Sequence, residues 1–203
     1  MSKIHGERER PILFSGPMVR AIIAGRKTQT RRIVKPQPEN IHKITVRPDD
    51  VLVEHWPKQE RSFSNFGRCE SLKHKYGSPG ERLWVRETFC EYPANYPIYK
   101  ADYGDGKLSP ISDGIGGPWK PSIFMPRWAS RITLEITDVR VERLQDISIN
   151  DCEAEGLSQD NSVGGCLRED YCNLWESING ADSWDANLFV WVISFNKLDG
   201  GAR

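Results

Sequence analysis

The chain has 203 residues, and its 28 lysines and arginines are balanced by 28 aspartates and glutamates. This neutral balance argues against a protein that coats nucleic acid through bulk positive charge, and a hydrophobic fraction of 38% argues against disorder. Because the sequence contains no run of 18 apolar residues and no apolar N-terminal leader, we expect one cytoplasmic domain over residues 1–203, without a membrane segment.

The five cysteines are spaced irregularly, and none forms a Cys-x-x-Cys pair or lies at ligand spacing from one of the four histidines. We therefore expect reduced thiols, and neither a metal nor a cofactor. Charge is distributed unevenly, because residues 11–38 contain six arginines and lysines and no acid, whereas carboxylates dominate residues 142–185. The basic segment predicts either a local anion-attracting mouth or an ordinary solvated face.

In chain order, the first expected elements are a strand and a helix. Residues 12–14 form an apolar run typical of a short strand, and Ser15 and Pro17 then mark the start of the helix. Its expected apolar stripe is Met18, Ile22 and Ile23. Gly25 can end the helix because glycine enters the left-handed conformation at little cost. Residues 27–34 follow as an extended segment.

Two loop-rich insertions are expected, at about 36–79 and 92–126. The first contains five prolines and little periodicity, with one strand near residues 50–53. The glycines at the centre of the second make regular structure unexpected there. Between the insertions, residues 82–87 alternate in polarity and predict a strand after a Gly-Glu turn.

The C-terminal half begins with the clearest strand pattern, over residues 131–144. The parity of its apolar residues changes near Thr137, which predicts a bulge or bend there. Helices are expected over residues 148–156 and about 167–177, and then a central strand at residues 190–195, which is apolar on both faces. This order favours an α+β fold, a mixed β-barrel with flanking helices and no internal repeat.

The segment AGRKTQTRR, residues 24–32, resembles the Gly-x-Lys-x-x-Thr-x-Arg signature of the ASCH family. The matching positions are Gly25, Lys27, Thr30 and Arg32. Residues 80–87 are similar to a family strand that follows a Gly-Glu turn, and a third match is the helix that ends at residues 154–156 together with the strand at residues 190–195. These matches cover about half of the chain. The two insertions make it similar to the larger ASCH proteins of phages and prophages.

The resemblance implies a PUA-like β-barrel and a link to RNA. Compact bacterial members of the family are N4-acetylcytidine amidohydrolases, in which the lysine of the motif accepts a proton, the threonine is the nucleophile and a glutamate donates a proton. Carried over, these catalytic roles fall on Lys27, Thr30 and Glu155. Other members resemble ribonucleases or RNA-binding modules, so an amidohydrolase, a ribonuclease and a non-catalytic RNA- or DNA-binding module all remain open.

The residues fit the chemistry of amide hydrolysis. A threonine hydroxyl needs a base, and Lys27 can serve as one if burial and neighbouring arginines lower its pKa. Glu87 is a rival to Glu155 as the acid. The candidate substrate-binding residues are Gly25, Arg26, Arg32, Trp84, Glu87 and Arg131. The expected partner is RNA or a modified nucleoside, and the sequence does not indicate an oligomeric state.

Overall fold

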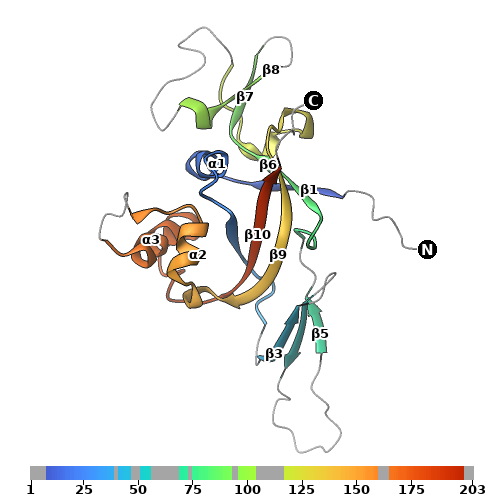
Figure 1. Ribbon diagram of the computed structural model, residues 1–203, viewed down its shortest axis with the longest axis vertical. Helices are drawn as coiled ribbons and strands as arrows, with labels where there is room; N and C mark the ends of the chain where they lie inside the picture. The colour runs from blue at the N-terminus through green and yellow to red at the C-terminus, as the bar shows by residue number, and fades with distance from the viewer. Residues whose placement is uncertain are drawn as a thin grey trace, which may run out of the picture.

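A five-stranded sheet forms the centre of the fold. In this computed structural model, the structure describes residues 8–38, 41–46, 51–55, 69–72, 75–92, 96–103, 117–159 and 165–198. The sheet consists of β1 (Glu9–Leu13), β6 (Arg82–Arg86), β9 (Thr133–Arg143), β10 (Phe189–Leu198) and β2 (Gln29–Ile33), in that spatial order (Figure 1). Strand β1 is parallel to β6, and the other pairs are antiparallel. The fold is therefore α+β, as expected.

Strands β9 and β10 form the longest ladder, and the ladder is bent at one place. Ser194 pairs with Asp138, but the next residue, Phe195, pairs with Ile136, so Thr137 is an extra residue in β9. The bulge expected near Thr137 is confirmed. It allows Ile136 and Val139 to enter the same hydrophobic core although they are three positions apart, and it curves the sheet.

The sheet is open rather than closed into the expected barrel. Strands β1 and β2 are its two edges, and no backbone ladder joins them among the described residues. A side chain bridges the gap instead, because Arg32 Nη2 donates a hydrogen bond to the carbonyl oxygen of Leu13 at 2.7 Å. The Arg32 guanidinium also lies 5.4 Å from the ring centroid of Phe14. The curvature of a barrel is thus present without its closing ladder.

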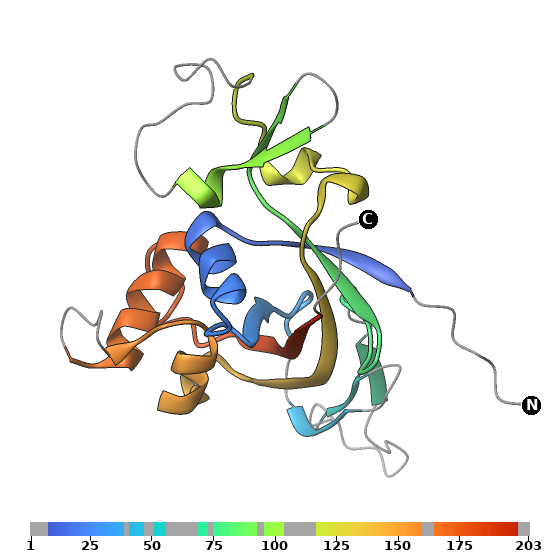
Figure 2. The same ribbon diagram turned by 45° about the horizontal axis from the view of Figure 1, so that its top comes forward.

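Three helices pack on the two sides of this sheet: α1 (Gly16–Ile23), α2 (Ile149–Ala154) and α3 (Leu167–Asn179). Helix α1 packs into the curve of the sheet, whereas α2 and α3 pack on the other face of β10 (Figure 2). Trp191 and Ile193 therefore enter the first core, and Val190 and Val192 enter the second. The expectation that β10 is central and buried on both faces is confirmed.

One part of the helix expectation was wrong. The buried residues of α1 are Val19, Ala21 and Ile22, whereas Ile23 is 43% exposed. Ala21 and Ile22 lie three and four residues after Met18, so helical spacing places them on the same face as Met18, whereas Ile23 lies five residues after it. No helix in the described ranges is long and apolar enough to cross a bilayer.

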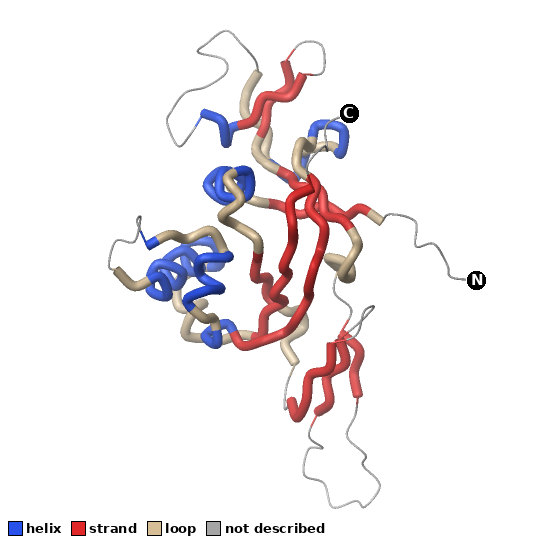
Figure 3. Tube along the Cα trace, viewed as in Figure 1, coloured by secondary structure: helices blue, strands red, loops and turns tan. Residues whose placement is uncertain are grey.

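Both insertions contain more regular structure than expected. The first forms a three-stranded antiparallel sheet of β3 (Ile41–Val46), β4 (Val51–His55) and β5 (Cys69–Leu72), where only β4 was expected. The second contains the hairpin of β7 (Phe89–Tyr92) and β8 (Tyr96–Tyr99), followed by short 3-10 turns at Lys100–Tyr103, Ser122–Phe124 and Arg127–Ala129. Its glycine-rich centre lies outside the described residues. The two additions project from opposite ends of the molecule (Figure 3).

Candidate functional site

The turn after α1 brings Lys27 against the end of α2. Gly25 takes a left-handed conformation, with φ +73°, and Lys27 then forms an antiparallel bridge with Glu155. Gly156, with φ +97°, allows this close approach. A Cβ at Gly156 would lie 3.0 Å from that of Ala21 and 3.1 Å from that of Lys27, closer than ordinary contacts permit. The two glycines therefore set the position of the site.

Helix α2 presents Glu155 through a well-defined start. Ser148 and Asp151 form a capping box, in which the Ser148 hydroxyl accepts from the Asp151 N–H and the Asp151 carboxylate accepts from the Ser148 N–H. The expected helix start and the stop at Gly156 are both confirmed. Because α2 has only six residues, these end contacts fix where Glu155 lies.

Lys27 and Glu155 form a buried ion pair. Lys27 Nζ donates to Glu155 Oε2 at 2.6 Å and to the Glu155 backbone oxygen at 2.9 Å, and the two residues are 2% and 5% exposed. Burial lowers the pKa of Lys27, Glu155 opposes that shift, and the nearby Arg32 and Arg31 add to it. The lowering that the sequence suggested for Lys27 therefore has burial as its main cause.

A second cation holds the other oxygen of Glu155. Arg31 Nη1 lies 3.3 Å from Glu155 Oε1, and Arg31 Nη2 lies 2.5 Å from Glu142 Oε1 and 3.4 Å from Asp151 Oδ2. Arg140 joins the same network by binding Glu142 Oε2 at 3.1 Å and Asp151 Oδ1 at 2.9 Å. Arg31 is thus neutralised by carboxylates, and Glu155 is fixed between two cations.

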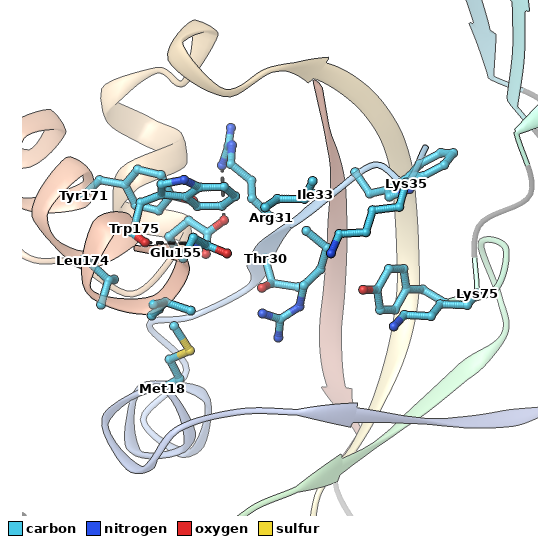
Figure 4. A pocket seen from close by; sticks show the side chains of 15 residues that line it. Met18, Thr30, Arg31, Ile33, Lys35, Lys75, Glu155, Tyr171, Leu174 and Trp175 are labelled. Atoms are coloured by element: carbon cyan, nitrogen blue, oxygen red, sulfur yellow. Dashed lines mark hydrogen bonds and ion pairs between the residues drawn. The ribbon is translucent and has the colours of Figure 1, made fainter. Parts of the chain in front are cut away.

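Glu155 and Thr30 line a cavity of about 490 Å³. Tyr171, Leu174 and Trp175 of α3 lie on one side of Thr30, and Lys35 and Lys75 lie on the other (Figure 4). The remaining described lining residues are Met18, Arg31, Arg32, Ile33, Tyr76, Ile178, Asn179 and Trp191. This volume is in the range of small-molecule sites. Lys27 is not among the described residues that line the cavity, but it binds Glu155, which lines it.

The side of β2 on which Thr30 lies can be derived from the ladder. Thr30 pairs with Ile193, whose side chain belongs to the core that contains Phe14. Lys27 Nζ lies 5.8 Å from the centroid of the Phe14 ring. Lys27 and Thr30 therefore direct their functional groups to the same side of the sheet. The Thr30 hydroxyl has no hydrogen-bond partner within the described part of the chain, which leaves it available to a ligand.

The other candidate residues divide into two groups. Arg32 lines the cavity, whereas Gly25 forms the turn and Arg26 donates to the Gly156 carbonyl oxygen at 3.1 Å. Trp84 is a core residue on which the guanidinium of Arg86 stacks, 4.6 Å from a ring centroid. Neither Trp84 nor the pair of Glu87 and Arg131 is among the described residues that line the cavity.

Glu87 and Arg131 form a separate ion-pair cluster. Arg131 binds both oxygens of the buried Glu87 carboxylate, at 2.9 and 3.1 Å, and both oxygens of Asp102 at 2.8 Å. Burial raises the pKa of Glu87, and Arg131 opposes the shift. The Arg131 guanidinium also lies 3.9 Å from the centroid of the Tyr99 ring. This cluster contacts the β7–β8 hairpin and lies apart from the cavity that Glu155 lines.

Sequence reasoning missed the aromatic wall of the cavity. Tyr171 and Trp175 are one helical turn apart on α3, and their rings lie 6.3 Å apart. Their spacing of four residues in an expected helix was a usable signal, because it places both on one face. Lys75 gave no signal, since it lies in an insertion without periodicity. No group of three or more His, Cys, Asp or Glu side chains within the described ranges could hold a metal ion.

In comparisons with known proteins, no family model and no curated protein matches the sequence. Among solved structures, the chain is similar to a crystal structure of a protein from Enterococcus faecalis V583, described as belonging to the family DUF984. The TM-score is 0.40 with 10% sequence identity, over 93% of this chain and 80% of that chain. The inferences below therefore rest on the residues of this chain.

Proposed function

We propose that the chain is an RNA- or nucleoside-binding protein of the ASCH type that removes the acyl group from N4-acylated cytidine or a related modified nucleoside. One observation carries the proposal. Glu155, which is bound at 2.6 Å by the buried Lys27 ammonium, lines the same cavity as the unpartnered Thr30 hydroxyl. The candidate acid and nucleophile therefore line one cavity of nucleoside size, and the candidate base, Lys27, is bound directly to the acid.

The buried ion pair can supply both the base and the acid. Transfer of one proton from the Lys27 ammonium to the Glu155 carboxylate gives a neutral amine and a neutral carboxylic acid. Both ions of the buried pair are costly to desolvate, so a ligand that excludes water from the cavity favours the neutral pair. The amine of Lys27 would then turn from Glu155 toward Thr30, which lies on the same side of β2.

The reaction then balances in two halves. The Lys27 amine takes the Thr30 proton as the Thr30 oxygen attacks the acyl carbonyl, and Glu155 gives its proton to the leaving N4 amine. The products are cytidine and an acyl ester of Thr30, with the ion pair restored. In the second half the pair activates a water molecule in the same way, and hydrolysis of the ester releases the carboxylic acid and the Thr30 hydroxyl.

RNA binding, with or without cleavage, is the second candidate function. The observation that favours it is that Arg32, Lys35 and Lys75 line the cavity with no carboxylate partner among the described residues. Arginine and lysine side chains are the usual ligands of phosphate oxygens, so these three cations could bind the backbone of an RNA strand. Turnover of N4-acetylcytidine distinguishes the two functions, because only the proposed hydrolase would release acetate.

The test is release of acetate from N4-acetylcytidine, measured by chromatography on the wild-type protein and on matched variants. We expect Lys27→Met and Thr30→Val to lose at least ~10²-fold in kcat/KM, because each removes a reacting group. Thr30→Ser keeps a hydroxyl and should retain measurable turnover, and Lys100→Ala on the surface should be unchanged. A well-folded wild-type protein that releases no acetate would refute hydrolysis and leave RNA binding or cleavage.

A further inference from the structure

The cavity has two chemically different ends. Lys35 and Lys75 lie at one end, Arg32 also lines the cavity, and in the described part of the chain none of these three cations is paired with a carboxylate. Arg31 also lines the cavity, but its charge is matched by Glu142 and Glu155. The excess positive charge is therefore local, since the whole chain is neutral.

The opposite end is aromatic and contains polar groups without partners. Trp175 is 5% exposed, and its Nε1–H is buried without a hydrogen-bond acceptor. Tyr171 is 3% exposed, and its hydroxyl makes no hydrogen bond to a described residue. Buried polar groups are nearly always satisfied in folded proteins, so the unpaired Trp175 Nε1–H on the wall of this cavity indicates that a ligand supplies its partner.

We infer that the cavity takes a phosphorylated nucleoside, with the base at the Tyr171–Trp175 end and the phosphate at the Lys35–Lys75 end. This inference rests on the proposed function and names its substrate class. A base fits the first end because it offers both a flat face to the aromatic rings and polar edge atoms to the free donors. The phosphate fits the second end because lysine and arginine donate charge-assisted hydrogen bonds to it.

An unphosphorylated nucleoside would use only part of this cavity. It would leave the charges of Lys35 and Lys75 without a counterion, and they lie on the far side of Thr30 from the aromatic wall (Figure 4). The phosphate can come from a free mononucleotide or from the backbone of an RNA strand, because both present the same oxygens. The two sources differ in whether a single nucleotide is sufficient for binding.

Binding of cytidine, cytidine 5′-monophosphate and a short cytidine-containing oligoribonucleotide tests the inference, by calorimetry on the whole chain. These are product-like ligands, so affinity is measured without turnover. We expect the monophosphate to bind at least ~10-fold more tightly than cytidine. The double variant Lys35→Ala/Lys75→Ala should lose that difference, and Lys35→Arg/Lys75→Arg should keep most of it. The control Lys100→Ala/Lys120→Ala removes the same charge elsewhere and should behave as wild type.

Each outcome separates the two claims. Equal affinity of the wild type for cytidine and its monophosphate would overturn the phosphate site while leaving the proposed nucleoside site in place. Failure of all three ligands to bind would overturn both. Tight binding of the oligoribonucleotide alone, lost in the Lys35→Ala/Lys75→Ala variant, would support the phosphate site and identify RNA as the source of the phosphate.

Discussion

The ion pair of Lys27 and Glu155 is asymmetric in its partners. Among the described residues, Lys27 Nζ has one carboxylate partner, whereas the Glu155 carboxylate is held by both Lys27 and Arg31. Removing the carboxylate leaves two buried cations with no common partner, whereas removing the lysine leaves Glu155 still paired with Arg31. The cost of breaking a buried pair comes mainly from the charge that is left behind, so the two deletions should not be equivalent.

We predict that Glu155→Gln lowers the free energy of unfolding by about 3–5 kcal/mol and that Lys27→Met lowers it by clearly less. Urea denaturation followed by tryptophan fluorescence measures both. Glu153→Gln, at an exposed position on the same short helix, is the matched control and should change stability little. Equal costs for the two deletions would show that Arg31 does not hold Glu155 as the structure indicates.

At the scale of elements, α2 controls the site through its capping box. Burial alone would raise the pKa of the Asp151 carboxyl, but hydrogen bonds from Ser148 and the charges of Arg31 and Arg140 lower it below its usual 3.8. A lowered pKa in the folded state means that Asp151 stabilises the fold fully at pH values above the unfolded value. The contribution disappears as the pH falls through the folded value.

Asp151→Asn should therefore reduce stability by about 1–2 kcal/mol at pH 7, since the helix start and two ion pairs are lost together. The difference between wild type and variant should shrink as the pH drops below about 4. Denaturation at several pH values measures it, with Asp146→Asn, an exposed residue just before the helix, as control. A difference that stays constant down to pH 2 would contradict the stabilising role of the charged carboxylate.

The elements that could be predicted are those with a strong local pattern. The parity change at Thr137 revealed the bulge because each side of it alternates clearly, and Gly156 marked the end of α2. Strands β3 and β5 were missed because each is defined by pairing with β4 rather than by an apolar run of its own. The same reason explains the missed β7–β8 hairpin.

The resemblance to the family motif identified the catalytic candidates, but it did not predict which residues surround them. Lys27 and Glu155 are 128 positions apart, and their contact depends on how the turns at Gly25 and Gly156 pack against each other, which the sequence does not show. Trp84 and Glu87 were grouped with the site because they are near a second family-like segment. They lie in β6 and directly after it, and β6 is separated from β2 by β9 and β10 in the sheet order. To predict which residues are close together in a sheet, the order of its strands must be known, and sequence patterns do not give that order.

At the scale of the whole molecule, zero net charge and a local group of three cations lead to different expectations for how RNA affinity depends on strand length and salt. A neutral surface gives little long-range attraction to a polyanion, so affinity should not grow as an RNA strand extends beyond the cavity. Each phosphate that a cation neutralises releases bound counterions, so the salt dependence of RNA affinity should reflect only the cations at the cavity. Both properties distinguish a cavity for one nucleotide from a long groove.

We therefore predict that the logarithm of the association constant for a single-stranded oligoribonucleotide falls against the logarithm of salt concentration with a slope of about −2, as three phosphate contacts require. Strands of four and twenty nucleotides should bind within about threefold of each other once the number of equivalent sites is considered. Fluorescence anisotropy measures both, and Lys35→Ala/Lys75→Ala should bring the slope to about −0.7. A slope that steepens with strand length would place the RNA along an extended basic surface, because contacts outside the cavity would then contribute.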